Sequence, residues 1–172
     1  MNPKLQFIFS RRSIRKYENR EIPEDMFHDL LEAAMAAPSA VAKDPWHFLI
    51  IQDRTTLDKI VKILPNAQML SQAPAALIVC GDIDKAHLNE LSYMLQDLSA
   101  AVENILLAAT ALGLGSCWLG VHPRPERITG IRDLFSLPQN IMPMCGIALG
   151  WPAESRHSRT RFKPERIHLE KW

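Results

Sequence analysis

The feature that most constrains the fold is a long apolar periodicity in the second half of the chain. Apolar residues recur in alternating steps of three and four from Leu88 to Leu112, which is the spacing of one face of an α-helix. The pattern predicts a helix of about 29 residues, ~43 Å long at ~1.5 Å per residue. Its second half, AAVENILLAATALGLG, is apolar on the other faces too, so we expect burial nearly all round. Such a helix should lie at the centre of a layered domain, pack against a second copy, or do both.

The composition is that of an ordinary soluble protein. The 172 residues, 47% of them hydrophobic, can bury a sizeable core, and we expect a single domain over residues 1–172. The net charge of +1 argues against a nucleic-acid or membrane-surface binder, because both normally carry a basic surface. No apolar run approaches the ~18 residues of a membrane span, and the apolar stretch before Arg11 is too short for a signal peptide. We therefore expect a cytoplasmic protein.

Cysteine and histidine are too scattered to indicate a disulfide framework or a metal site. Cys80, Cys117 and Cys145 are odd in number and far apart, so the pattern favours buried, reduced thiols. The six histidines show no HxH or HxxxH spacing. We therefore expect no protein metal site.

Shorter patterns predict an α+β fold, with a central sheet, helices on both of its faces and the long helix as the dominant element. Asn2 and Pro3 have the chemistry of a helix start. A second helix should begin near Pro23 and end at Pro38. The predicted strands are apolar runs at 46–51, 75–80, 116–121 and 144–149. A short helix is expected at 55–64.

The last segment, residues 152–172, is rich in Arg, Pro and Glu and lacks a long periodic pattern. It still carries spaced apolar residues, namely Phe162, Ile167, Leu169 and Trp172. An arm with spaced apolar anchors is expected to bind another surface, and a partner subunit is one candidate.

The densest cationic cluster is SRRSIRK at residues 10–16. It has the chemistry to bind a phosphate, because guanidinium groups present paired donors to phosphate oxygens. A solvated basic turn after the N-terminal helix explains the same residues. From the residues alone, both interpretations stay open.

Two segments with small residues are candidates for close approach to a ligand. The turn APSA at 37–40 either lets backbone amides approach a flat ligand or only ends a helix. The glycines of 113–120 do not fit a dinucleotide-binding turn, because they end a helix and open a strand. Gly113 is expected as a left-handed helix cap, and Gly120 has a backbone N–H that a ligand could use. No nucleophile or paired-carboxylate motif stands out, which favours reactivity that belongs to a cofactor.

Six segments, in this order, resemble the nitroreductase family. They are RRSIRKY at 11–17, APSAV at 37–41, PWHF at 45–48, NILLAATALGLGSCWLG at 104–120, GIALGWP at 146–152 and RFKPERIHLEKW at 161–172. The resemblance spans almost the whole chain. It implies an α+β fold, with a mixed sheet flanked by helices and a long central helix, in an intertwined homodimer. Two FMN molecules would lie at the subunit interface, and the arm at 152–172 would lie across the partner.

The resemblance also implies which residues bind FMN. Arg11, Arg12 and Ser13 match the segment that holds the phosphate and ribityl chain. Arg15 matches a cation near the N1/O2 edge of the flavin, and Arg161 matches a basic residue that returns to the phosphate. A loop that packs beside the flavin from the second subunit is matched by Pro38, Ser39 and Ala40. A segment whose backbone faces the flavin is matched by Trp118, Leu119 and Gly120.

The implied function is an FMN-dependent oxidoreductase that passes electrons from NADH or NADPH to a small acceptor, such as a nitroaromatic or quinone, by a ping-pong mechanism. Ala42 and Asp44 stand where the family usually has Asn and Gln, and the chain lacks the insertions that roof the pocket in larger members. Two alternatives therefore stay open. One is a protein that holds flavin with little turnover, and the other is a specialised flavin enzyme of this fold, such as a reductive dehalogenase or a flavin-destroying enzyme. A nucleic-acid binder is disfavoured by the net charge.

Overall fold

The sheet has four strands in the order β1-β2-β4-β3. The computed structural model describes residues 2–172, and the strands are β1 (Trp46–Ile51), β2 (Ala75–Asp82), β3 (Gly115–Gly120) and β4 (Ile141–Gly150). All three strand pairs are antiparallel. The sheet was expected to be mixed, but among the described residues the only parallel pairing is an isolated bridge between Ser13 and Ser116. Apolar runs predict that strands are buried but carry no information about strand direction.

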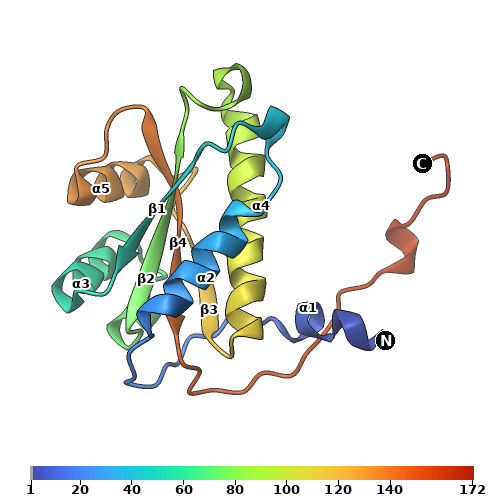
Figure 1. Cartoon of the computed structure of the whole chain (residues 1–172), viewed down its shortest axis with the longest axis horizontal. Coiled ribbons are helices and arrows are strands. Elements are labelled where there is room, and N and C mark those ends of the chain that lie inside the picture. The colour runs from blue at the N-terminus through green and yellow to red at the C-terminus, as the bar shows by residue number, and fades with distance from the viewer. Residues whose placement is uncertain (1) are drawn as a thin grey trace.

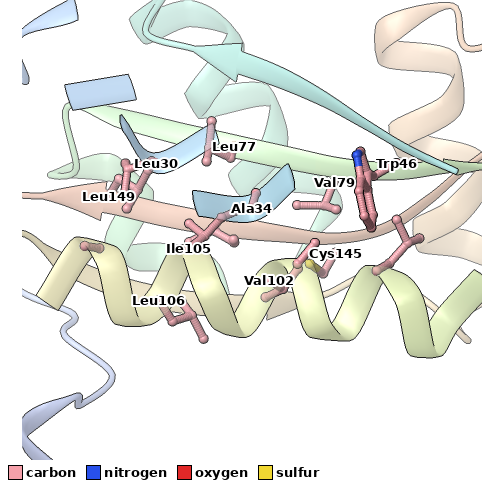
Figure 2. Close-up of a cluster of buried hydrophobic side chains, with 14 of the residues drawn as sticks. Leu30, Ala34, Trp46, Leu77, Val79, Val102, Ile105, Leu106, Cys145 and Leu149 are labelled. Carbon is pink, nitrogen blue, oxygen red and sulfur yellow. The ribbon is translucent and has the colours of Figure 1, made fainter. Parts of the chain in front are cut away.

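Helices cover both faces of the sheet, as expected (Figure 1). On one face lie α2 (Glu24–Met35) and α4 (Leu91–Ala111), and on the other lie α3 (Arg54–Ile63) and α5 (Pro125–Phe135). All of β2 is buried, and its side chains alternate between the two cores. Figure 2 shows side chains of α2, α4, β2 and β4 meeting in the first of these cores.

The long helix is shorter than its periodicity predicts. It has 21 residues, because Leu88 and Asn89 form a 3-10 turn with φ of 55° and 54° instead of the first helical turn. Leu88 is in phase with the apolar stripe but is 73% exposed. At the other end Gly113 has φ 79°, which confirms the left-handed cap. The second half is less enclosed than predicted, since part of its surface, including Leu107 and Ala108, is only half-buried.

The other elements that the sequence predicts agree with the structure to within a few residues. The N-terminal helix is split into a 3-10 turn (Pro3–Leu5) and α1 (Gln6–Ser10), and the Asn2 side chain accepts from the Lys4 amide at 3.0 Å. The helix α5 was not predicted, although Pro125 and Glu126 are good first-turn residues. The remaining 3-10 turns are Ala40–Ala42, Gln68–Ser71, His87–Asn89 and Pro164–Arg166.

The three cysteines are buried and unpaired, as expected. Burial raises the pKa of the Cys80 thiol to about 12, so this side chain stays a neutral thiol and behaves as an apolar core residue. Among the described helices, none is long and apolar enough to cross a lipid bilayer.

Candidate functional site

Arginines from two distant parts of the chain meet at the end of α1. The pKa of Arg12 is lowered by desolvation and then by repulsion from Arg159, Arg156, Arg11 and Arg161. An Arg12 Nη donates to the carbonyl oxygen of His157 at 2.5 Å, which joins the N-terminal segment to the arm. We call Arg11, Arg12, Arg156, Arg159 and Arg161 the arginine cluster. Because like charges repel one another, the cluster favours an anion with several oxygens, and the chemistry of phosphate fits it.

Only part of this charge is neutralised within the chain. Arg11 pairs with Glu103 of α4 at 3.7 Å, and Arg156 pairs with Glu154 at 2.7 Å. Arg12, Arg159 and Arg161 are in none of the ion pairs that the described residues form. The cluster therefore keeps positive charge for a ligand.

Glu154 holds the two segments together. Its Oε1 accepts from the Arg15 backbone N–H at 2.6 Å, and its Oε2 accepts from Arg156. The Arg15 amide, and after it Arg156, lower the pKa of this carboxyl below its usual value. Glu154 was not singled out from the sequence, because its partner Arg15 is 139 residues away.

A groove of about 510 Å³ lies beside this segment. It brings together four of the expected residues, Arg15, Trp118, Leu119 and Gly120. It also contains residues that the sequence did not reveal as site residues, among them polar ones from the turn after α3, namely Asn66 and Gln68. We call this the Arg15 groove.

The wall of the Arg15 groove formed by β3 is the edge of the sheet. Leu119 is 4% exposed and points into the core, so only its backbone can face the groove. Trp118 is 38% exposed, and Gly120 is exposed. Beyond the Ser13–Ser116 bridge, the described residues pair with β3 only on its β4 side. Edge-strand amides without a strand partner can donate to a ligand.

Pro38, Ser39 and Ala40 lie elsewhere in the single chain. Their loop contacts the first half of α4, where the Ala40 amide donates to Asp97 at 2.8 Å. Figure 1 shows this loop and the segment after α1 toward opposite ends of α4. The loop borders a different groove, of about 640 Å³, between Val41, Lys43 and the turn at Asp84–Asn89. The structure therefore separates the expected site residues into two groups.

The arm extends away from the body of the molecule (Figure 1). Its anchors are all exposed, namely Phe162, Ile167, Leu169 and Trp172. Its basic part begins in the arginine cluster, and its apolar side chains are not buried against any of the described residues.

The fold and this geometry define an α+β protein of the nitroreductase type. Comparison with known proteins agrees. The sequence model of the nitroreductase family matches residues 8–67 and 62–151. A protein from Methanothermobacter thermautotrophicus, provisionally named NADH dehydrogenase/NAD(P)H nitroreductase, is 48% identical over 98% of this chain and 87% of its own. The chain belongs to the nitroreductase family.

Solved structures confirm the expected fold. A Parabacteroides distasonis protein with the same provisional name superposes with a TM-score of 0.93, at 37% identity and full coverage of both chains. A provisionally named nitroreductase from Desulfovibrio desulfuricans, solved in complex with FMN, gives 0.85 at 32% identity, covering 100% of this chain and 99% of that one. The family resemblance read from six segments is thus confirmed, while the individual site residues stay predictions.

Glu154→Gln should loosen the junction between the arm and Arg15. A group whose folded pKa is lowered stabilises the fold above its unfolded pKa, and this contribution is lost as the pH falls through the folded pKa. In the native protein, protection of the Arg15 amide from hydrogen exchange should therefore fall below about pH 4.5. In the variant, protection at pH 7 should already be about fivefold lower, because a neutral acceptor is weaker than a charged one.

The matched control is Glu165→Gln, which changes an exposed carboxylate of the same arm. It should leave protection of the Arg15 amide unchanged at every pH. Equal protection in native protein and Glu154→Gln would contradict the assigned role of Glu154.

Proposed function

We propose that the chain is an FMN-dependent oxidoreductase that passes electrons from NADH or NADPH to a small acceptor, such as a nitroaromatic or a quinone. The observation that carries this proposal is the arginine cluster next to the Arg15 groove. The cluster suits one phosphate, and the groove has a cation and free edge-strand amides beside an exposed aromatic ring. The FMN bound in the Desulfovibrio desulfuricans relative supports the choice of cofactor.

The residues present fit FMN in a defined way. Arg11, Arg12 and Arg161 would hold the phosphate, with Arg159 as a further donor that the structure adds. Arg15 would face the flavin edge on which negative charge develops, and a fixed cation there favours the reduced form. When bound, FMN supplies the redox chemistry itself, taking up two electrons from the donor and passing them on. This accounts for the lack of a nucleophile or acid–base pair in the sequence.

We propose a ping-pong order for this reaction, and the short length of the chain favours it. The chain covers nearly the full length of its structural relatives from Parabacteroides and Desulfovibrio, but only 73% of a Bacillus subtilis FMN reductase. A short chain would leave the flavin face open to a donor and then to an acceptor in the same place. Direct transfer needs mainly a reacting distance of ~3–3.5 Å and alignment.

We also propose that the working unit is a homodimer. Within one chain the 38–40 loop lies away from the Arg15 groove, so a second copy is needed to bring the two together. Apolar surface for such an interface is present on the arm and on the N-terminal turns, where Leu5, Phe7 and Ile8 are each more than 40% exposed. Exposed apolar surface on this scale indicates an interaction site. We propose a cytoplasmic location for this dimer.

The alternative of a flavin-holding protein rests on the 39–44 loop. Asp44 accepts a hydrogen bond from the Ser39 hydroxyl at 2.5 Å and is thereby directed into the loop. At this position the family usually has the side-chain amide of Gln, and Asp44 does not provide it. Turnover separates this alternative from the proposed enzyme.

Anaerobic addition of NADH or NADPH should bleach the flavin absorbance of the purified protein within one turnover, and a nitroaromatic or quinone should restore it. Flavin released by heat should be FMN, because the cluster suits a single phosphate. Recovery of FAD, or a yellow protein that neither donor bleaches, would contradict the proposal. A specialised enzyme of the same fold would bleach but fail to pass electrons to these acceptors.

Arg11→Ala should weaken FMN binding by about 1.5–3 kcal/mol, roughly 10- to 150-fold in Kd, the usual worth of a hydrogen bond to a charged group. The matched control is Arg124→Ala, since Arg124 is exposed at the start of α5 and outside the arginine cluster. Fluorescence titration with FMN measures both. Equal losses would show that the cluster is only a basic surface.

Deletion of Ile167–Trp172 should weaken both the dimer and FMN binding, because the arm leads from the arginine cluster to the exposed anchors. Sedimentation equilibrium and flavin titration measure the two effects. Glu170→Ala, which changes one exposed charge in this segment, should alter neither. A folded monomer with full FMN affinity would refute the interface.

A further inference from the structure

A buried carboxylate on α4 has no role in the site described so far. Asp97 is 5% exposed, and its Oδ1 accepts from the Ala40 amide at 2.8 Å. Its Oδ2 is buried and has no hydrogen-bond partner among the described residues. No cation pairs with it in the ion pairs of the described chain. A buried carboxylate with a single partner costs free energy of folding, so stability does not explain this residue.

The segment that Asp97 holds has an unfavourable backbone. Val41, Ala42 and Asp44 have φ of 55°, 52° and 49°. This left-handed region is uncommon for residues other than glycine, and especially for a β-branched residue such as Val41. Strained backbone persists only when the surroundings enforce it, and it gathers at functional sites.

Two anchors enforce this backbone. Within the loop, the Ser39 hydroxyl donates to Asp44 Oδ1 at 2.5 Å and accepts from the Asp44 amide at 3.0 Å. This pair closes the loop on itself but does not fix its place on the protein. Asp97 supplies that fixed point, because it ties Ala40 to the buried face of α4.

We propose that Asp97 is a positioning residue for the flavin site, which holds the 38–44 loop in its strained shape against α4. This inference rests on the proposed function, in which Pro38, Ser39 and Ala40 face the FMN of the partner subunit. The loop has Ala42 and Asp44 where the family usually has the side-chain amides of Asn and Gln. We therefore expect the loop to contact the cofactor through its backbone. A backbone contact depends on the exact place of the loop, and hence on Asp97.

This role makes stability and cofactor binding respond differently to substitution. Asp97→Ala removes an uncompensated buried charge together with one hydrogen bond and a small volume, so the free energy of unfolding of the apoprotein should stay unchanged or rise. The loop loses its fixed point, so FMN binding should fall. Asp97→Asn keeps an oxygen acceptor in the same place and should hold the loop.

The matched control is Asn104→Ala on the same helix. The Asn104 side chain donates to the Ala33 carbonyl at 2.9 Å and so ties α4 to α2 instead of to the loop. Its removal should lower stability and leave FMN affinity within about threefold of the native value, a change of less than ~1 kcal/mol.

The experiment compares native protein with these three variants by three measurements: urea unfolding of the apoprotein, hydrogen exchange at the Ala40 amide, and FMN titration. Asp97→Ala should expose the Ala40 amide to exchange and weaken FMN binding by about tenfold or more, which corresponds to ~1.4 kcal/mol, without loss of stability. Asp97→Asn should restore most of the FMN affinity.

Native FMN affinity in Asp97→Ala would overturn the inference, and so would a loss of affinity matched by the same loss of stability as in Asn104→Ala. Failure of the native protein to bind FMN would instead overturn the proposed function. In that case Ala40 exchange still reports whether Asp97 anchors the loop.

Discussion

The close packing of α4 on the centre of the sheet is the contact on which the rest of the structure depends. Gly81 of β2 shows how close it is, because a Cβ at this position would lie 2.4 Å from the sulfur of Met94 and 2.8 Å from Leu98. Three polar residues then extend from α4 to other elements. Asp97 reaches the 39–44 loop, Glu103 reaches Arg11, and Asn104 reaches α2. Both halves of the candidate site therefore take their positions from one helix.

The arginine cluster follows from a different kind of constraint. Its members come from the first sixteen and the last twenty-two residues of the chain, and they meet because Glu154 and the His157 carbonyl tie these ends together. Repulsion among guanidinium groups opposes this arrangement. A bound phosphate would relieve this repulsion, so the electrostatic cost of bringing the arginines together would favour binding of an anion.

Most of the helices and strands could be predicted from the sequence, because buried positions recur as apolar residues at regular spacing or in short runs. The strands, α2 and the Gly113 cap were found in this way. The predicted start of α4 was wrong. Leu88 continues the apolar periodicity of the helix, but hydropathy carries no information about the backbone angle φ, which is positive at this residue. Trp118 and Arg15 were predicted as site residues through the family resemblance, and they line one groove. Glu154 and Asp97, in contrast, act through partners that are distant in sequence. A single sequence does not reveal such pairs, and no motif marks them.

The arm has a consequence for how the protein behaves at different concentrations. It begins among the groups proposed to hold phosphate and ends in exposed apolar side chains that we propose to pack on a partner subunit. If the proposed interface forms, cofactor binding and subunit association would be linked equilibria, and each would strengthen the other by the same factor. Dilution of the protein would release flavin, and flavin would in turn hold the subunits together. The cellular supply of cofactor would thus set how much of the chain exists as assembled enzyme.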